Sequence, residues 1–385
     1  MGSKPGTDFE TIQQALLSAR VKDRAFLLAI DDTYTLASDG IIVDKAVTIC
    51  GESREGTIFG DAISTTTPYV FLVTVSGVTF KRLTVKSQYD AAIILSGTGS
   101  SDGRVTNFLI DDVRVEFMSA GIILRACGWA IKDSDFVRQG NQPSPRAIIV
   151  YGVCNACAVL FTQFSLGTPD DTRAIYVTSS SPSRRDEYNY GVLSVILCRV
   201  HDPISTFFMQ DNFRGPKRGL VLDFENNYAN EVADWALAYS TDKNDGDIFD
   251  KCIFRQNTAS GNNHSGFLSI SGSVPTTGIV RSFRSIGGLP IYATGNVFST
   301  LPCSIQLPFM ESQGSADCMV AFNREAFSAD SCGVQPQTNV RYLNPAERGR
   351  RGQSGTVLLD VLQRQNRQPN DSLVEILKSV AGRPM

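Results

Sequence analysis

Apolar residues recur along the chain in a short motif with nearly constant spacing. The motif is a small residue followed by three mostly aliphatic ones, and its clearest copies begin at Ala92, Gly121, Ala147 and Ala174. Consecutive copies begin 29, 26 and 27 residues apart, and looser copies cover residues 206–209, 235–238 and 266–269. A period of this length is typical of stacked repeats. We expect one β-rich coil per repeat. Successive coils should stack so that one column of side chains is formed by Ile93, Ile122, Ile148 and Ile175.

A second pattern lies between copies of the first. An apolar residue is followed three positions later by a small one and two positions after that by another apolar one. Its copies begin at Phe80, Ile110, Ile131, Val159, Val195 and Phe249. If the strand bends, period-two alternation places these three positions near one face. Each coil then holds at least two strands, and stacking the coils buries a continuous core.

The N-terminal region predicts a cap for this stack. Residues 8–20 form a short amphipathic pattern, with Asp8 as the expected N-cap. The residues expected on its apolar side are Phe9, Ile12, Ala15 and Leu16. An uncapped coil exposes backbone N–H and C=O groups that template aggregation, so we expect this helix to cover the open end.

The same region resembles the start of pectin lyase-like proteins, the right-handed parallel β-helix superfamily. The resemblance rests on the pattern F-x-T-I-Q-x-A at residues 9–15 and V-T-I-x-G-E at residues 47–52, and it covers about residues 8–300. The G-x-Y turn typical of the family lacks its glycine here, at residues 32–34. The resemblance implies an all-β, right-handed parallel β-helix. It implies little about function, because the superfamily includes lyases, hydrolases, esterases, phage tailspikes and inert structural proteins.

Four segments are expected along the chain. They are an N-terminal cap helix at 1–24, the parallel β-helix at 25–300, an irregular C-terminal cap at 301–345, and a linker with a short helical tail at 346–385. The tail contains two helix candidates, residues 357–364 and 372–380. The second has an apolar stripe formed by Leu373, Ile376, Leu377 and Val380. This stripe either docks on the solenoid or binds another protein or a second copy, which would make a homo-oligomer.

Composition excludes some classes of function. The 36 basic and 39 acidic residues leave a net charge of −3, which offers no electrostatic case for nucleic acid. No apolar run reaches the ~18–20 residues of a membrane span, and the N-terminus lacks the form of a signal peptide.

The nine cysteines are expected to be mostly free thiols inside strands, at Cys50, Cys127, Cys198 and Cys252. Reduced cysteines favour intracellular synthesis or a virion, although the sequence does not determine the compartment. The C-x-x-C pair at residues 154–157 has no second pair and no nearby histidine, so we interpret it as a bend rather than a metal or redox site.

Candidate catalytic groups are few. The acidic residues Asp111, Asp112, Asp133 and Asp135 lie at strand ends of adjacent coils and predict an acidic ladder. Such a ladder could bind calcium, act as a hydrolase pair, or be a solvated outer face. His201 and Asp202 could orient a general base or simply form a turn. With two histidines in the chain, no metal site is predicted.

Candidate ligand-binding residues gather between 180 and 245. They are Tyr188, Tyr190, Arg214, Lys217, Arg218, Tyr228 and Trp235. Flat rings stack on pyranose faces, and arginine binds anionic sugars. Insertions in solenoids cluster on one face, which is often the binding face.

The sequence favours a non-catalytic β-helix that is structural, glycan-binding or adhesive, such as a virus particle component, because no catalytic constellation is complete. The alternative is a polysaccharide lyase or glycoside hydrolase acting on an acidic polysaccharide. No cofactor is expected, except calcium if the protein is a lyase. The expected partners are a carbohydrate, or another protein through the C-terminal helix.

Overall fold

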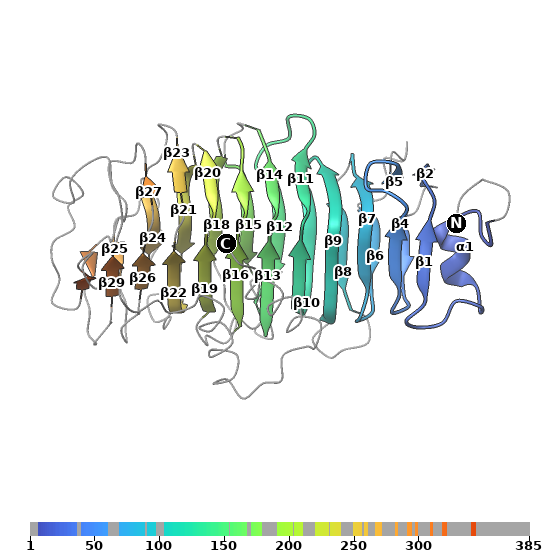
Figure 1. Cartoon of the computed structure of the whole chain (residues 1–385), viewed down its shortest axis with the longest axis horizontal. Coiled ribbons are helices and arrows are strands. Elements are labelled where there is room, and N and C mark those ends of the chain that lie inside the picture. Colours follow the sequence, from blue (N-terminus) through green and yellow to red (C-terminus); the bar gives the residue numbers. More distant parts are fainter. Residues whose placement is uncertain are drawn as a thin grey trace.

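The chain forms an elongated solenoid of parallel strands, seen from the side in Figure 1. The computed structural model describes residues 7–36, 40–60, 69–88, 91–97, 104–153, 155–167, 171–178, 191–202, 204–210 and 220–230. Beyond residue 230 it describes the backbone of short strands.

Each complete coil contains three strands, where the sequence predicts at least two. Equivalent strands of successive coils pair side by side along the solenoid, and we call each such row of paired strands a file. The long file contains β1 (Phe26–Ala29), β4 (Thr48–Gly51), β7 (Thr79–Lys86), β9 (Val105–Phe117), β10 (Ala120–Lys132), β13 (Ala156–Leu160), β16 (Val192–Ile196), β19 (Leu220–Glu225), β22 (Phe249–Arg255), β26 (Ile291–Thr294), β29 (Cys318–Ala321) and β30 (Val340–Leu343). The short file contains β2 (Asp32–Thr35), β5 (Thr57–Gly60), the ends of β7 and β9, β11 (Asp135–Arg138), β14 (Gln163–Ser165), β17 (Arg199–Val200), β20 (Tyr228–Asn230), β23 (Thr258–Ser260) and β27 (Val297–Phe298).

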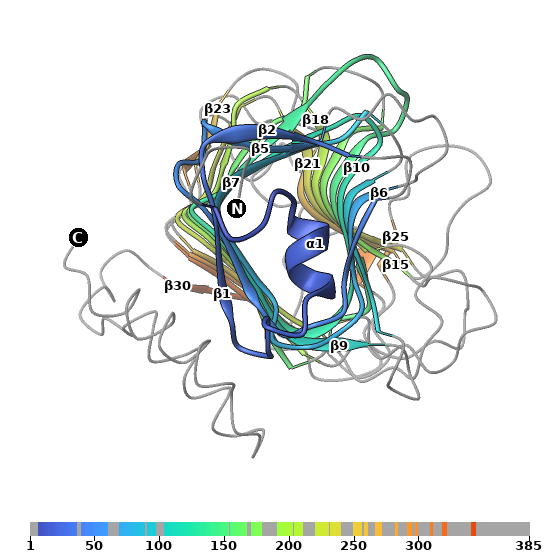
Figure 2. The same ribbon diagram turned by 90° about the vertical axis from the view of Figure 1, so that its right-hand side faces the viewer.

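The third file, sheet B, completes the coil. It contains β3 (Ile41–Val43), β6 (Tyr69–Val73), β8 (Ala91–Ser96), the start of β10, β12 (Arg146–Tyr151), β15 (Arg173–Thr178), β18 (Ile204–Gln210), β21 (Val232–Tyr239) and β24 (Gly266–Ser271). A separate two-stranded parallel sheet joins β25 (Ser282–Phe283) to β28 (Phe309–Met310). Viewed from the N-terminal end, the chain passes clockwise from β1 through β2 to β6 as it recedes (Figure 2). The parallel β-helix is therefore right-handed, as predicted.

The predicted isoleucine column is confirmed. In sheet B, Ile122 lies opposite Ile93 on one side and Ile148 on the other, and Ile148 lies opposite Ile175. All four side chains are fully buried.

Two of the looser copies are shifted by one residue. Phe208 lies opposite Ile175, and Leu268 lies opposite Ala236. The predicted positions were Phe207 and Phe267. Because Phe207 and Phe208 are both buried, hydrophobicity alone does not decide which of them continues the column.

The second pattern marks the corner between the long and short files. Its third residue has a left-handed backbone, with φ between 48 and 58°, at Arg82, Asp112, Asp133, Phe161, Leu197 and Asn226. The fourth residue faces the inside of the corner, and where it is Ser, Thr, Cys or Asn it hydrogen-bonds the backbone of the corner. Ser134 Oγ donates to the Lys132 carbonyl at 2.7 Å, and Asn227 Nδ2 donates to the Val195 carbonyl at 2.8 Å.

One copy of this pattern was placed wrongly and one was missed. Phe254, not Phe249, lies opposite Phe224, which begins the missed copy. The fourth residue of that copy is Asn227, a buried polar side chain. The sequence pattern requires a small residue at this position, so it does not detect the copy that contains Asn227.

The N-terminal helix α1 (Ile12–Leu17) lies inside the ring of strands at the end of the solenoid (Figure 2). Its N-cap is Thr11 rather than Asp8, because Thr11 and Gln14 have the spacing of a capping box. Asp8 instead pairs with Arg20 Nη2 at 3.2 Å. Ile12, Ala15 and Leu16 are buried against the core, as predicted.

The expectation of free thiols holds for part of the chain. Cys50, Cys157 and Cys198 are free and buried, and burial raises the pKa of Cys198 to about 12. Cys127, in contrast, is disulfide-bonded. Its neighbours Ala126 and Leu124 point into the core, so alternation places Cys127 on the outer surface.

The predicted segment boundaries stay predictions. The backbone of β29 and β30 pairs in the long file within 301–345, and the helix candidates at 357–364 and 372–380 lie outside the described residues. In the part of the chain that the structure describes, no helix has the length and apolarity needed to cross a membrane.

Candidate functional site

Asp111, the first candidate carboxylate, lies between two lysines of the neighbouring coils. Strand register places it opposite Lys81 on one side and Lys132 on the other. Each Nζ approaches a different Asp111 oxygen at 3.0 Å, and 10% of the Asp111 side chain is exposed. This row alternates in charge, so the predicted acidic ladder is not formed.

The other predicted carboxylates do not line up with Asp111. Asp133 occupies the left-handed bend, half exposed, and its carboxylate is 3.9 Å from Lys132 Nζ. Asp135 lies opposite Arg114 and Gln163. Within the described residues, no group of three or more His, Cys, Asp or Glu side chains is arranged to hold a metal ion.

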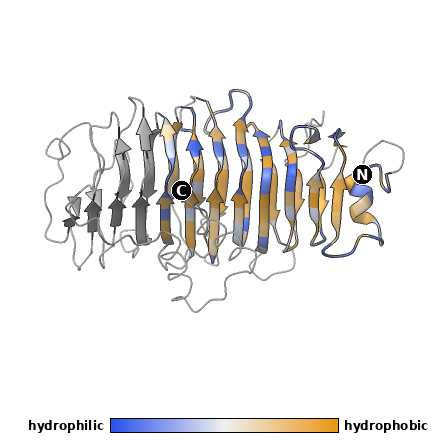
Figure 3. Cartoon of the chain, viewed as in Figure 1, coloured by the Kyte–Doolittle hydropathy of each residue, from blue (hydrophilic) through white to orange (hydrophobic). Residues whose placement is uncertain are grey.

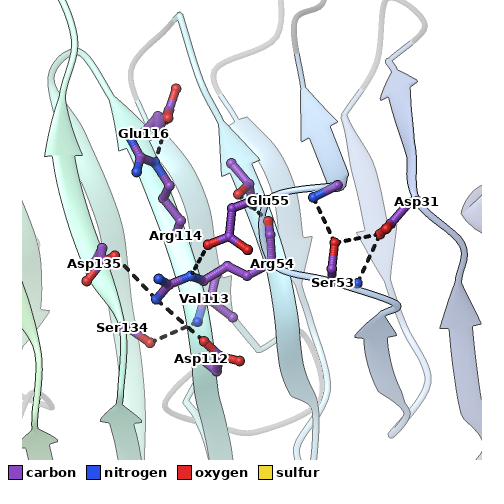
Figure 4. Close-up of polar contacts among 12 residues, drawn as sticks. Asp31, Ser53, Arg54, Glu55, Asp112, Val113, Arg114, Glu116, Ser134 and Asp135 are labelled. Carbon is purple, nitrogen blue, oxygen red and sulfur yellow. Dashed lines mark hydrogen bonds and ion pairs between the residues drawn. The ribbon is translucent and has the colours of Figure 1, made fainter.

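Asp112 and Asp135 meet instead at the guanidinium of Arg54 (Figure 4). Arg54 Nη1 lies 3.4 Å from Asp112 Oδ1 and 3.3 Å from Asp135 Oδ2, while its Nε lies 3.1 Å from Glu55 Oε1. The three acidic side chains come from the turn that holds Arg54, from β9 and from β11. One cation thus links the coil of β4 and β5 to the coils of β9 and β11, across the coil of β7 that lies between them.

The turn that carries Arg54 is held by Asp31. Asp31 Oδ1 accepts from the Ser53 backbone N–H at 3.0 Å and from Thr57 Oγ1 at 2.9 Å. Gly56 is required here, because a Cβ at this position would lie 2.4 Å from Asp31 Cγ. The arginine therefore projects from a rigid support.

The electrostatic environment of Asp112 opposes its ionisation. Burial raises the pKa of this carboxyl group, and attraction by Arg54 offsets only part of the effect. A carboxyl of raised pKa beside a second carboxylate is an arrangement that acid–base catalysis uses. The cluster is therefore the strongest candidate for chemistry among the described carboxylates.

His201 and Asp202 contact different groups of the preceding coil. His201 Nε2 lies 2.9 Å from Gln163 Oε1, and Asp202 Oδ2 accepts from the Gly167 backbone N–H at 3.1 Å. These two contacts join neighbouring coils.

Of the predicted ligand-binding residues, Tyr228 has a described side chain. It is exposed on the short file, where its backbone lies opposite Arg199. Trp235 belongs to β21, whose backbone alone is described. The remaining five, Tyr188, Tyr190, Arg214, Lys217 and Arg218, lie outside the described residues.

A basic and aromatic group on the outer face of sheet B was not predicted. Arg146 of β12 and Arg173 of β15 lie opposite each other. Both guanidinium carbons lie over the Tyr176 ring, 4.7 and 4.8 Å from its centroid. Arg173, 8% exposed, is paired with Asp171.

Arg146 differs from its neighbour in having no anionic partner. Its side chain is half-buried, and within the described residues it makes neither a hydrogen bond nor an ion pair. The Nε atoms of both arginines are buried without an acceptor. The terminal nitrogens of Arg146 are not buried, so an anion with several oxygens could accept from them, and the tyrosine offers a flat ring beside them.

A signal for this group was present in the sequence. Arg146 and Arg173 each stand directly before the small residue of the first motif, in two consecutive copies. Equivalent positions in consecutive coils become neighbours, so a repeated arginine predicts a basic pair on one face.

Comparison with protein-family models and with curated proteins gives no match. Among solved structures, the chain is similar to a pectin methylesterase from Yersinia enterocolitica, with 14% identity and a TM-score of 0.36 over 66% of this chain and 90% of that one. It is also similar to a pectin methylesterase in complex with a hexasaccharide, with 12% identity and a TM-score of 0.34 over 96% of each chain. Scores this low carry no argument about activity. The right-handed parallel β-helix predicted from the sequence rests on the strand pairing described above.

Proposed function

We propose that this chain is a non-catalytic β-helix that binds an acidic glycan on the outer face of sheet B. The observation that carries the proposal is Arg146, a half-buried cation over Tyr176 with no anionic partner among the described residues. Carboxylate or sulfate groups of a glycan would accept from the two arginines, while a sugar ring packs near the tyrosine.

The state of Asp111 supports a role without catalysis. A general base or nucleophile must be free to take a proton or attack a substrate. Asp111 is bound by an ammonium group on each side and is mostly buried. Its contacts join three coils, which suits a stiff scaffold. A structural role in a virus particle is proposed from this fold alone.

The proposal is tested by measuring the affinity of the purified protein for a uronate polymer by calorimetry. We expect Arg146→Ala to weaken binding by roughly 10–100-fold, because charge-assisted hydrogen bonds contribute about 1.5–3 kcal/mol. Tyr176→Leu should weaken binding as well, through loss of the flat ring.

Arg199→Ala is the matched control, because Arg199 is an exposed arginine on the short file. It removes the same charge from a different face and should leave affinity nearly unchanged. Equal losses in Arg146→Ala and Arg199→Ala would indicate attraction by overall charge. That result, or an absence of binding, would contradict the proposal.

A second candidate function is hydrolysis or lyase cleavage of an acidic polysaccharide at the Arg54 cluster. The observation that favours it is the raised pKa of Asp112 beside Asp135, since a proton-donating carboxyl and a carboxylate form the glycosidase pair. Depolymerisation of a uronate polymer, assayed with and without calcium, would favour this candidate if Asp135→Asn abolishes it and Arg199→Ala does not.

A further inference from the structure

The outer face of the long file carries a second apolar cluster, which we call the outer stripe. It consists of Ala130, Ala156, Ala158, Leu160, Val192, Ile196 and Val221. These residues alternate with Cys157, Val159 and Val195, which belong to the core inside the solenoid. Because successive strand residues point to opposite faces, the outer stripe points away from the core.

The outer stripe begins where the row of charges ends. Lys132, the last member of the row that contains Asp111, lies opposite Leu160, and Leu160 lies opposite Ile196. The face thus changes from ion pairs to aliphatic side chains at β13. Figure 3 shows the same change, with blue bands on β9 and a largely orange β13.

The outer stripe is not a solvated surface. Its side chains are only 0–7% exposed, whereas an outward sheet face in contact with water is normally polar. No partner chain is present, so the cover belongs to this chain. Among described hydrophobic residues, Leu109 and Phe161 pack against the stripe. Leu109 lies opposite Ala130 on the same face, and Phe161 occupies the bend beside Leu160. Both border the stripe rather than cover it.

We propose that the segment 372–380 of this chain covers the outer stripe as an amphipathic helix. Its four apolar residues fall at i, i+3, i+4 and i+7, at Leu373, Ile376, Leu377 and Val380. Nine helical residues span about 13.5 Å, and three adjacent strands spaced about 4.8 Å apart span about 10 Å. One such helix is therefore long enough to cross β13, β16 and the Val221 end of β19, whose other outward residues are the buried acids Asp223 and Glu225.

The composition of the outer stripe suits this occupant. Three alanines at one end leave room for close approach of a helix, and Leu160, Val192 and Ile196 supply larger surfaces beside them. The long file lies across the solenoid from sheet B (Figure 2). The docked helix therefore leaves Arg146 and Tyr176 accessible, and its test is independent of glycan binding.

A photo-crosslink in the full-length chain tests the contact directly. A photo-reactive leucine analogue at position 377 should crosslink within the monomer to peptides that contain Leu160 or Ile196. The same analogue at position 379, on the polar side of the helix, should not reach these peptides. Crosslinks from position 377 to another segment, or between two chains, would overturn the proposal.

Hydroxyl-radical footprinting gives a second readout. Leu377→Asp should raise the oxidation of Leu160 and Ile196 severalfold and leave Val159 and Val195 protected, while Ser379→Asp should change neither pair. Unchanged protection of Leu160 in Leu377→Asp would refute the docking. If all four residues become oxidised, the variant has unfolded. The photo-crosslink from position 377, measured in the otherwise unchanged chain, then tests the docking.

Discussion

At the scale of a residue, Asp112 combines a left-handed backbone with a carboxyl group whose pKa is raised by burial. Asn tolerates the same backbone and carries no charge. Because the folded pKa exceeds the unfolded one, the folded state binds more protons between the two values, and the stability from this group falls as pH rises through that window. We therefore expect Asp112→Asn to gain stability relative to the natural protein as pH rises from acidic to neutral. Thermal unfolding of both proteins across this range measures the difference, and a difference that is flat or shrinks with pH would contradict the expectation.

At the scale of an element, six successive corners between the long and short files, from Arg82 to Asn226, use a left-handed residue at the same place, whereas the β1–β2 and β4–β5 corners do not. Asp112, Asp133 and Asn226 suit this backbone, whereas Leu197 does not. A left-handed conformation costs an ordinary residue roughly 1–2 kcal/mol, and Asn or Asp visits it more readily. The Leu197 side chain is 41% exposed, so little packing is lost on its replacement.

We expect Leu197→Asn to raise the free energy of unfolding by up to about 1 kcal/mol. Leu197→Val should lower it, because a β-branched side chain fits this backbone poorly. The midpoint of urea unfolding measures both changes. An asparagine variant less stable than the valine variant would contradict backbone strain at Leu197.

At the scale of the whole molecule, the solenoid depends on its ends being covered. In the described chain β1, β2 and β3 pair on one side only, and α1 fills the opening beside them. Leu16 faces the core, while the next residue, Leu17, is 74% exposed. We expect Leu16→Asp to displace the cap and convert soluble monomer into aggregate, because a buried carboxylate is costly and free strand edges associate.

Leu17→Asp provides the adjacent control and should remain monomeric. Size-exclusion chromatography with light scattering distinguishes the two outcomes. Equal behaviour of the two variants would show that the helix does not protect the end of the solenoid.

The fold was predictable because its signals are local. The isoleucine column follows from copies of one motif, and the cap helix follows from the apolar spacing of residues 12–16. The errors lie where local pattern is ambiguous. Phe207 and Phe208 are equally hydrophobic, and Asp8 and Thr11 are both acceptable caps until Gln14 completes the capping box with Thr11.

The candidate site was less predictable because charged side chains face outward, where periodicity does not distinguish them. Asp111 was grouped with other acids by position in the sequence, yet its neighbours are Lys81 and Lys132 from the coils on each side. The basic pair of Arg146 and Arg173 was overlooked although both residues occupy the same place in the repeat.

The sequence by itself determined the period of the coils, the inward-facing residues and the β-helix that they imply, because alternation and repeat length are properties of the chain. The tertiary structure decided which outward side chains meet. Which outward side chains contact each other depends on the register between coils, and this register is set by connections of unequal length. Whether a charged side chain needs a partner depends on how exposed it is. That is why Asp111 is neutralised by two lysines, whereas Arg146 has no anionic partner among the described residues.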